Sequence, residues 1–167
     1  MTLSTDELES AYRRLEKPLH NYLYRWFWDP RMSEDLIHDV FERIWRRRSK
    51  VDAAGLDALV WTALVNLARS RYRRAQRWKW APLPSALLSL SNPESVALSD
   101  ERDSRLRSAM YQLPDSAREA LLLEIHSGMR RAEIARCLNI PEGTLASRKH
   151  NAVKRLQVLL KVPDNEV

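Results

Sequence analysis

The sequence has little of what builds phosphate-binding loops, disulfide frameworks and zinc modules. Among its 167 residues are three glycines and one cysteine, Cys137. Glycine-rich loops that cradle phosphates and large β-sandwiches with glycine turns are therefore poor candidates. A lone cysteine can form neither an intramolecular disulfide nor a cysteine-rich zinc site, and it indicates a reducing compartment.

Long apolar runs and catalytic constellations are missing as well. The longest apolar stretch, residues 58–65, is interrupted by Thr62 and is far too short to cross a bilayer. The polar, acidic start of the chain lacks the pattern of a signal peptide. The four histidines form no HExxH or other ligand-like cluster, and no serine has a recognisable base and oxyanion arrangement around it. We therefore expect a cytoplasmic protein with no enzymatic activity, no metal or other cofactor, no small-molecule substrate and no direct membrane insertion.

Positive charge, in contrast, is in excess and is concentrated in two places. The chain has 28 Lys and Arg residues against 22 Asp and Glu residues, which gives a formal net charge of +6. Six basic residues and no acidic residue lie between Arg69 and Lys79, and residues 46–50 form a second basic cluster. This balance suits a polyanionic partner.

The apolar residues recur at steps of three and four through most of the chain, which is the period of amphipathic helices. The pair Asp29-Pro30 should end the first helix, and Ser33 should cap the second. A third helix is expected at residues 56–77, with Leu59 facing inward. The predicted fold class is all-α, with two small helical domains at residues 1–77 and 99–167. Residues 78–98, which include three prolines, should form the linker between them.

The six tryptophans divide by position. Trp26, Trp45 and Trp61 lie at core-like spacing and are predicted to be structural, whereas Trp78 and Trp80 flank the basic run. The single cysteine lies on the apolar side of a short predicted helix, where it should be a small buried side chain.

The end of the second domain predicts a helix-turn-helix. Two helices, at about residues 130–138 and 142–161, are separated by the tight turn Asn139-Ile140-Pro141. Polar and basic residues share one face of the second helix, and side chains of this kind contact base edges and phosphates. They are Thr144, Ser147, Arg148, Asn151 and Arg155. A solvated helix face is the alternative, but the preceding turn favours DNA contact.

These residues resemble a known family. Glu133-Ile134-Ala135, Ile140-Pro141-Glu142-Gly143-Thr144-Leu145 and Ser147-Arg148 are similar to the fourth conserved region of bacterial sigma factors, with the extracytoplasmic-function (ECF) subfamily as the nearest group. Glu34-Asp35-Leu36, Asp39-Val40-Phe41, Asn66-Leu67-Ala68 and Tyr72-Arg73-Arg74 resemble the second region. The chain departs from the family pattern at Ser70, where an acid is frequent, and at Lys149, where leucine is usual.

The resemblance implies a sigma factor that binds core RNA polymerase, recognises the −35 and −10 promoter elements, assists melting of the DNA and is controlled by an anti-sigma factor. The implied −35 contacts are Arg130, Arg131, Thr144, Ser147, Arg148, Lys149, Asn151 and Arg155. The implied −10 contacts are Asn66, Arg69, Ser70, Arg73 and Arg74. The implied polymerase-binding residues are Asp35, Leu36, Asp39, Val40, Phe41 and Trp45. For the four apolar members of the last set, burial in the core is an equal alternative, and Asn66 could be a structural residue between helices.

Other classes of function remain open at this stage. One is a ligand-gated helix-turn-helix regulator that does not act as a polymerase subunit. Another is a sigma-like decoy that binds polymerase or an anti-sigma factor without opening DNA. A basic amphipathic protein of the membrane surface is disfavoured, because the basic stretches belong to helices with ordinary cores.

Overall fold

A computed structural model describes residues 2–78 and 97–161. The described residues form seven α-helices and no strand, which confirms the predicted all-α class. The helices are α1 (Thr5–Phe27), α2 (Pro30–Arg46), α3 (Leu56–Trp78), α4 (Ala97–Tyr111), α5 (Asp115–His126), α6 (Arg131–Leu138) and α7 (Glu142–Leu160), with two 3₁₀ turns, η1 (Arg48–Lys50) and η2 (Ala53–Gly55), between α2 and α3. Most of the predicted linker, with its three prolines and Trp80, lies outside the described residues. No helix in the described part of the chain is long and apolar enough to span a membrane.

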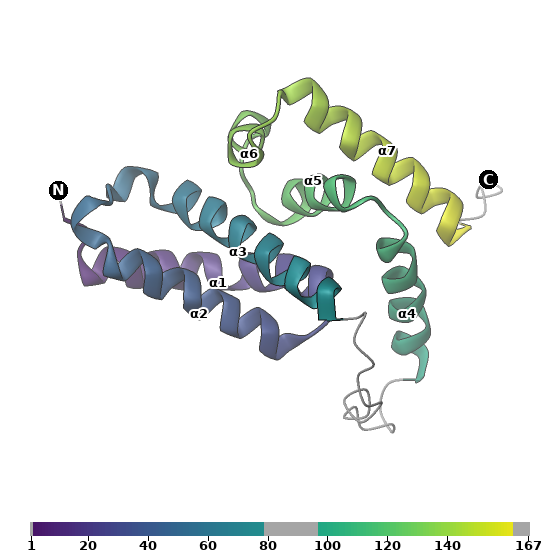
Figure 1. The fold of residues 1–167 in the computed structure, drawn as a ribbon, viewed down its shortest axis with the longest axis horizontal. Coiled ribbons are helices and arrows are strands. Elements are labelled where there is room, and N and C mark those ends of the chain that lie inside the picture. The colour runs from purple at the N-terminus through teal and green to yellow at the C-terminus, as the bar shows by residue number, and fades with distance from the viewer. Residues whose placement is uncertain (1, 79–96, 162–167) are drawn as a thin grey trace.

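Helices α1, α2 and α3 pack together as the first half of the molecule (Figure 1). The start of α1 is closed by a capping box, in which the Ser4 hydroxyl accepts from the Glu7 N–H and the Glu7 carboxylate accepts from the Ser4 N–H. Tyr22 and Trp61 are fully buried between the helices, in an edge-to-face contact with ring centroids 5.7 Å apart. Trp26 is also buried, so the structural role predicted for Trp26 and Trp61 is confirmed.

Two predictions about this half were wrong. The cap of α2 is Asp29, whose carboxylate accepts from the N–H groups of Arg31 and Met32, and Ser33 is a buried residue of the first turn. Helix α1 ends at Phe27, where Trp28 takes the left-handed conformation, and Pro30, with no N–H to donate and a fixed φ, begins α2. Leu59 is 40% exposed rather than inward-facing.

Helices α4 to α7 form the second half. Helix α4 begins at Ala97, two residues ahead of the predicted start of the second domain, and the observed bounds of α6 and α7 are within a residue of the helices predicted at 130–138 and 142–161. Gly128, with φ of +67°, follows the end of α5, where a left-handed residue lets the chain turn toward α6. Leu145 and Ala152 are buried and hold α7 against α5.

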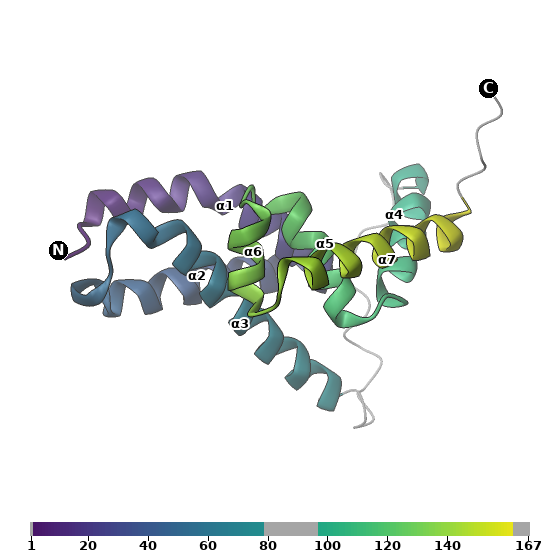
Figure 2. The same cartoon turned by 90° about the horizontal axis from the view of Figure 1, so that it is seen from above.

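The two halves pack directly on one another. Helix α5 lies on α1, and α6 lies on α3 (Figures 1 and 2). This contact brings the end of the chain that carries the helix-turn-helix onto the basic helix α3.

Candidate nucleic-acid interface

The helix-turn-helix is formed by α6, α7 and the turn between them. Asn139 ends α6 in the left-handed conformation with φ of +54°, and the N–H of Ile140 donates to the carbonyl of Ala135 at 3.0 Å. These bonds satisfy the last carbonyls of α6 and fix the angle at which the chain enters α7. Because Leu145 and Ala152 face the core, the opposite face of α7 is turned to solvent.

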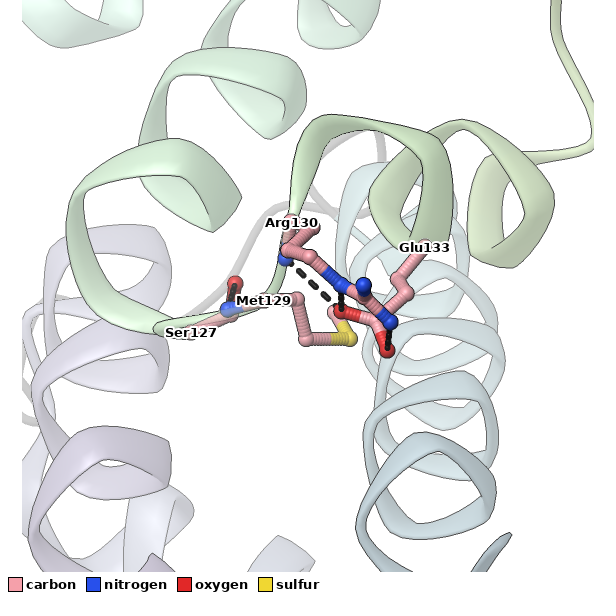
Figure 3. Close-up of polar contacts among 4 residues, drawn as sticks. All are labelled: Ser127, Met129, Arg130 and Glu133. Carbon is pink, nitrogen blue, oxygen red and sulfur yellow. Dashed lines mark hydrogen bonds and ion pairs between the residues drawn. The ribbon is translucent and has the colours of Figure 1, made fainter.

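The side chain of Glu133, in the first turn of α6, caps the start of that helix (Figure 3). The Glu133 carboxylate accepts from the backbone N–H of Arg130 at 2.8 Å, and the Ser127 hydroxyl oxygen accepts from the N–H of Met129 at 3.1 Å. The hydrogen bond from the Arg130 backbone lowers the pKa of Glu133. The Arg130 guanidinium lies 3.5 Å from the same carboxylate but is 84% exposed, so it can reach a partner in solvent.

The other −35 candidates differ in their exposure to solvent. Ser147, Asn151 and Arg155 are exposed, and Thr144 is half-buried. The Ser147 hydroxyl donates to the carbonyl of Gly143 at 3.0 Å, which leaves its oxygen free to accept. These side chains form one polar surface along α7.

Two of the predicted −35 cations, Lys149 and Arg131, form ion pairs with an acid of the same chain. Glu124 of α5 accepts from the Lys149 ammonium through one carboxylate oxygen and lies 3.4 Å from the Arg131 Nε through the other. Lys149 therefore fills its leucine-like position with its stem and carries its charge to an acid.

The five −10 candidates on α3 lie together. With Arg77, they line a hollow of about 370 Å³; they are Asn66, Arg69, Ser70, Arg73 and Arg74. Beside it runs an open groove of about 1160 Å³ between α2 and α3. The groove has an apolar floor that includes Leu59 and Leu67 and a cationic rim that includes Arg43, Arg46 and Lys50. The exposure of Leu59 is explained by its place in this floor.

Arg69 is the exception among these five, because it is held by the other half of the molecule. Its guanidinium donates to both carboxylate oxygens of Glu119 on α5, at 2.6 and 2.7 Å, and Glu119 is 4% exposed. This bidentate pair raises the pKa of Arg69. Arg69 and Arg73 line a cavity of about 240 Å³ together with Glu119 and Arg148 of α7. The two candidate reading faces thus meet at the contact between the halves.

Next to this pair lies a fully buried arginine. The Arg118 guanidinium is 4.2 Å from the ring centroid of Trp26, 5.2 Å from that of Tyr72 and 2.8 Å from the Asp115 carboxylate. The charge is stabilised by the aromatic faces and the ion pair. Sequence reasoning gave Arg118 and Glu119 no role, although two adjacent charged residues inside an apolar helix are a signal of partners elsewhere.

Comparison with known proteins finds matches to both halves of the chain. Two family models match the chain, Sigma-70 region 2 over residues 11–78 and Sigma-70, region 4 over residues 103–156. The ECF RNA polymerase sigma factor SigK of Mycolicibacterium vanbaalenii is 27% identical over 158 residues, which cover 90% of this chain and 80% of the relative. The ECF RNA polymerase sigma factor SigL of Mycobacterium tuberculosis is 28% identical over 160 residues, which cover 92% and 89%. The chain belongs to the ECF sigma factors.

Solved structures share the fold of this ECF sigma factor over nearly its whole length. CnrH, in complex with the cytosolic domain of CnrY, superposes with a TM-score of 0.68 at 19% identity and covers 94% of this chain and 89% of its own. The sigma factor RpoE of Bartonella quintana, in complex with the anti-sigma factor NepR, gives a TM-score of 0.71 at 24% identity and covers 95% and 99%.

The polymerase-binding prediction for this sigma factor needs a correction. Leu36 and Val40 are fully buried in the core, and Phe41 is 7% exposed, so these three side chains hold the first half together. An apolar stripe shows that a helix face is covered but not whether another helix or a partner covers it. Of the remaining candidates, Asp35 is exposed, and Asp39 is partly exposed with its carboxylate 3.8 Å from Arg71. Trp45 is half-buried beneath the Arg48 guanidinium, 4.1 Å from its ring centroid.

Proposed function

We propose that this ECF sigma factor directs core RNA polymerase to promoters by reading a −35 element with α7 and a −10 element with α3. The observation that carries the proposal is the pair of polar, cationic faces on these helices, one in each half of the molecule. On α7 the exposed contacts are Ser147, Asn151 and Arg155, with Arg148 beside them. On α3 they are Asn66, Ser70, Arg73 and Arg74.

The roles of the side chains follow from their chemistry. Asn66 has both a donor and an acceptor and can recognise a base edge, whereas Arg73 and Arg74 suit phosphates. The cationic rim of the adjoining groove between α2 and α3 suits the backbone of an unpaired strand, and its aliphatic floor offers van der Waals contact to bases. Contact with core polymerase is assigned to Asp35, Asp39 and Trp45, the members of the predicted set that reach the surface of α2.

The proposal requires the halves to separate. The −35 and −10 elements lie about 25 base pairs apart, or roughly 80 Å at about 3.4 Å per base pair. Arg148 and Arg73 line one cavity, so the faces that carry them cannot contact both elements in the arrangement described above. We infer that this arrangement is the closed, inactive form, and that polymerase and DNA bind an open one. An anti-sigma factor that stabilised the closed form would silence the protein. The site of action that this function implies is the cytoplasm.

The test is transcription from fragmented genomic DNA by purified core enzyme with and without this protein, followed by sequencing of the RNA 5′ ends. Start sites that appear only with the protein, and that share two upstream elements, are the expected result. A ligand-gated regulator would instead give tight, sequence-specific footprints by itself and no new start sites with core enzyme. A decoy would bind core enzyme without producing transcripts.

A further inference from the structure

The acidic residue Glu124 lies among the cations of the helix-turn-helix. We propose that Glu124 is a positioning residue, which sets the orientation of α7 on the DNA by holding Lys149 and Arg131 and thereby keeps both cations off the phosphates. The inference rests on the proposed reading of a −35 element by α7. It assigns Lys149 and Arg131 a different task from the DNA contact that their charge suggests.

The contacts of Glu124 join all three helices of this half that surround the turn. Its carboxylate comes from α5, and it binds Lys149 in α7 and the first residue of α6, Arg131. The Glu124 side chain is only 10% exposed, whereas Lys149 is 38% and Arg131 52% exposed. The carboxylate is therefore the fixed point, and the two cations reach toward it.

Burial explains why the pairs persist when DNA binds. A nearly buried carboxylate that loses its partners keeps an uncompensated charge, which is strongly unfavourable. A phosphate placed on Lys149 would also lie near the Glu124 carboxylate, and the two negative charges would repel. If Lys149 turned toward a phosphate, the Glu124 carboxylate could not follow it into water and would remain buried without that partner. This cost keeps Lys149 on Glu124.

The position of Lys149 on α7 turns this pair into a control of reading. Residues 145, 149, 152 and 156 follow one another at steps of four and three, so Lys149 lies in the row that faces the core, between Leu145 and Ala152. Arg148 is about 100° away around the helix axis. A rotation of α7 that released Lys149 would move Arg148, Ser147 and Asn151 off their bases together.

The experiment uses holoenzyme assembled from core polymerase and the full chain, on a promoter that the protein recognises and on the same promoter with a scrambled −35 element. In Glu124→Gln the shape is kept and both cations are released. We expect the preference for the intact −35 element to fall about tenfold. The slope of log K against log salt should steepen by about 1 to 2, since each new phosphate contact adds about 0.9.

Glu142→Gln is the matched control. It removes the same charge from the first turn of α7, where Glu142 is exposed and takes part in no ion pair among the described residues. Its preference for the intact −35 element and its salt slope should match those of wild type. If both glutamine variants behave alike, the effect is one of net charge, and the proposal is overturned.

Lys149→Ala separates positioning from phosphate contact. The proposal predicts a weaker −35 preference with an unchanged salt slope, and a slope flattened by about 1 would make Lys149 a phosphate contact and overturn it. Lys149→Arg, which keeps a cation on the Glu124 carboxylate, should retain most of the preference, which guards against simple loss of folding. Wild-type holoenzyme that ignores the −35 element would overturn the proposed function, whereas wild type that needs the element beside an unchanged Glu124→Gln would overturn this inference alone.

Discussion

The two candidate reading helices are held in place in different ways. On α7 the reading face is fixed within its own half, by Leu145 and Ala152 in the core and by the Glu124 carboxylate on Lys149. On α3 the cation Arg69 is held by Glu119, which belongs to the other half. Opening of the molecule should therefore free the α3 face and leave the geometry of the α7 face unchanged. If α7 and α3 read the two elements as proposed, −35 reading depends on contacts within one half of the molecule, while −10 reading depends on how the two halves are arranged.

The largest effect is expected from Asn66→Ala on α3. The variant should bind core polymerase and form a closed complex, but its run-off yield from fully paired DNA should fall about 5- to 150-fold, because a contact to a base edge contributes about 1–3 kcal/mol. A template with a pre-melted bubble should restore much of the yield, since unpairing is then already achieved. Permanganate reactivity of unpaired thymines, measured with the run-off yield, reports opening. Equal defects on both templates would make Asn66 a structural residue.

An effect of equal or smaller size is expected from Arg148→Ala on α7. Loss of a base contact should cost about 1–3 kcal/mol and relax selectivity at one position of the −35 element. The loss should be absent on a promoter with a scrambled −35 element, and it should not depend on whether the template is paired or melted. His150→Ala, an exposed neighbour on α7, is the control. Unchanged −35 dependence in Arg148→Ala would place the reading face elsewhere on α7.

Glu119→Gln tests the link between the halves. It removes the charge from a buried bidentate pair, which is worth about 1–3 kcal/mol, so the ratio of closed to open molecules should fall about 5- to 150-fold. The radius of gyration of the free protein, measured by X-ray scattering, should increase, and binding of the free protein to DNA should strengthen. Glu101→Gln, at an exposed position of α4, should change neither. An unchanged radius in Glu119→Gln would show that Arg118 and its aromatic partners hold the halves together without this pair.

The smallest effect concerns acid and the two helix caps. Hydrogen bonds from the backbone N–H groups of Ser4 and Arg130 lower the pKa of Glu7 and of Glu133 from the ordinary value of 4.5. Each carboxylate therefore stabilises its helix fully above pH 4.5, and this contribution is lost as the pH falls through the lowered pKa. At pH 7, Glu7→Gln should speed hydrogen exchange only in the first turn of α1, and Glu133→Gln only in that of α6. A difference from wild type that persisted below the lowered pKa would exclude the charged cap as its cause.

The sequence predicts the helices of this protein well because their causes are local. The helix-turn-helix is defined without reference to the rest of the chain. Its signals are the spacing of apolar residues, Asn139, which takes the left-handed conformation, and Pro141. The sequence points to Ser33 as the cap of α2, whereas Asp29 takes that place, because proline suits the first position of a helix directly after its cap. The residues that join distant helices could not be found in this way, since Arg69 and Glu119 are fifty positions apart and neither alters a helical period. Lys149 in a leucine position did signal an unusual contact, but its partner Glu124 became identifiable only from the packing of α5 against α7.

One measurement tests most directly the claim that two reading faces meet in the free protein and separate on the promoter. Fluorescent labels are attached to cysteines that replace Ala75 on α3 and His150 on α7, each two residues from a side chain of the shared cavity, with Cys137 replaced by Ser. Energy transfer between the labels should be high in the free protein and should fall when core polymerase and promoter DNA with both elements are added. Transfer that stayed high while the same sample produced run-off transcripts would contradict the account.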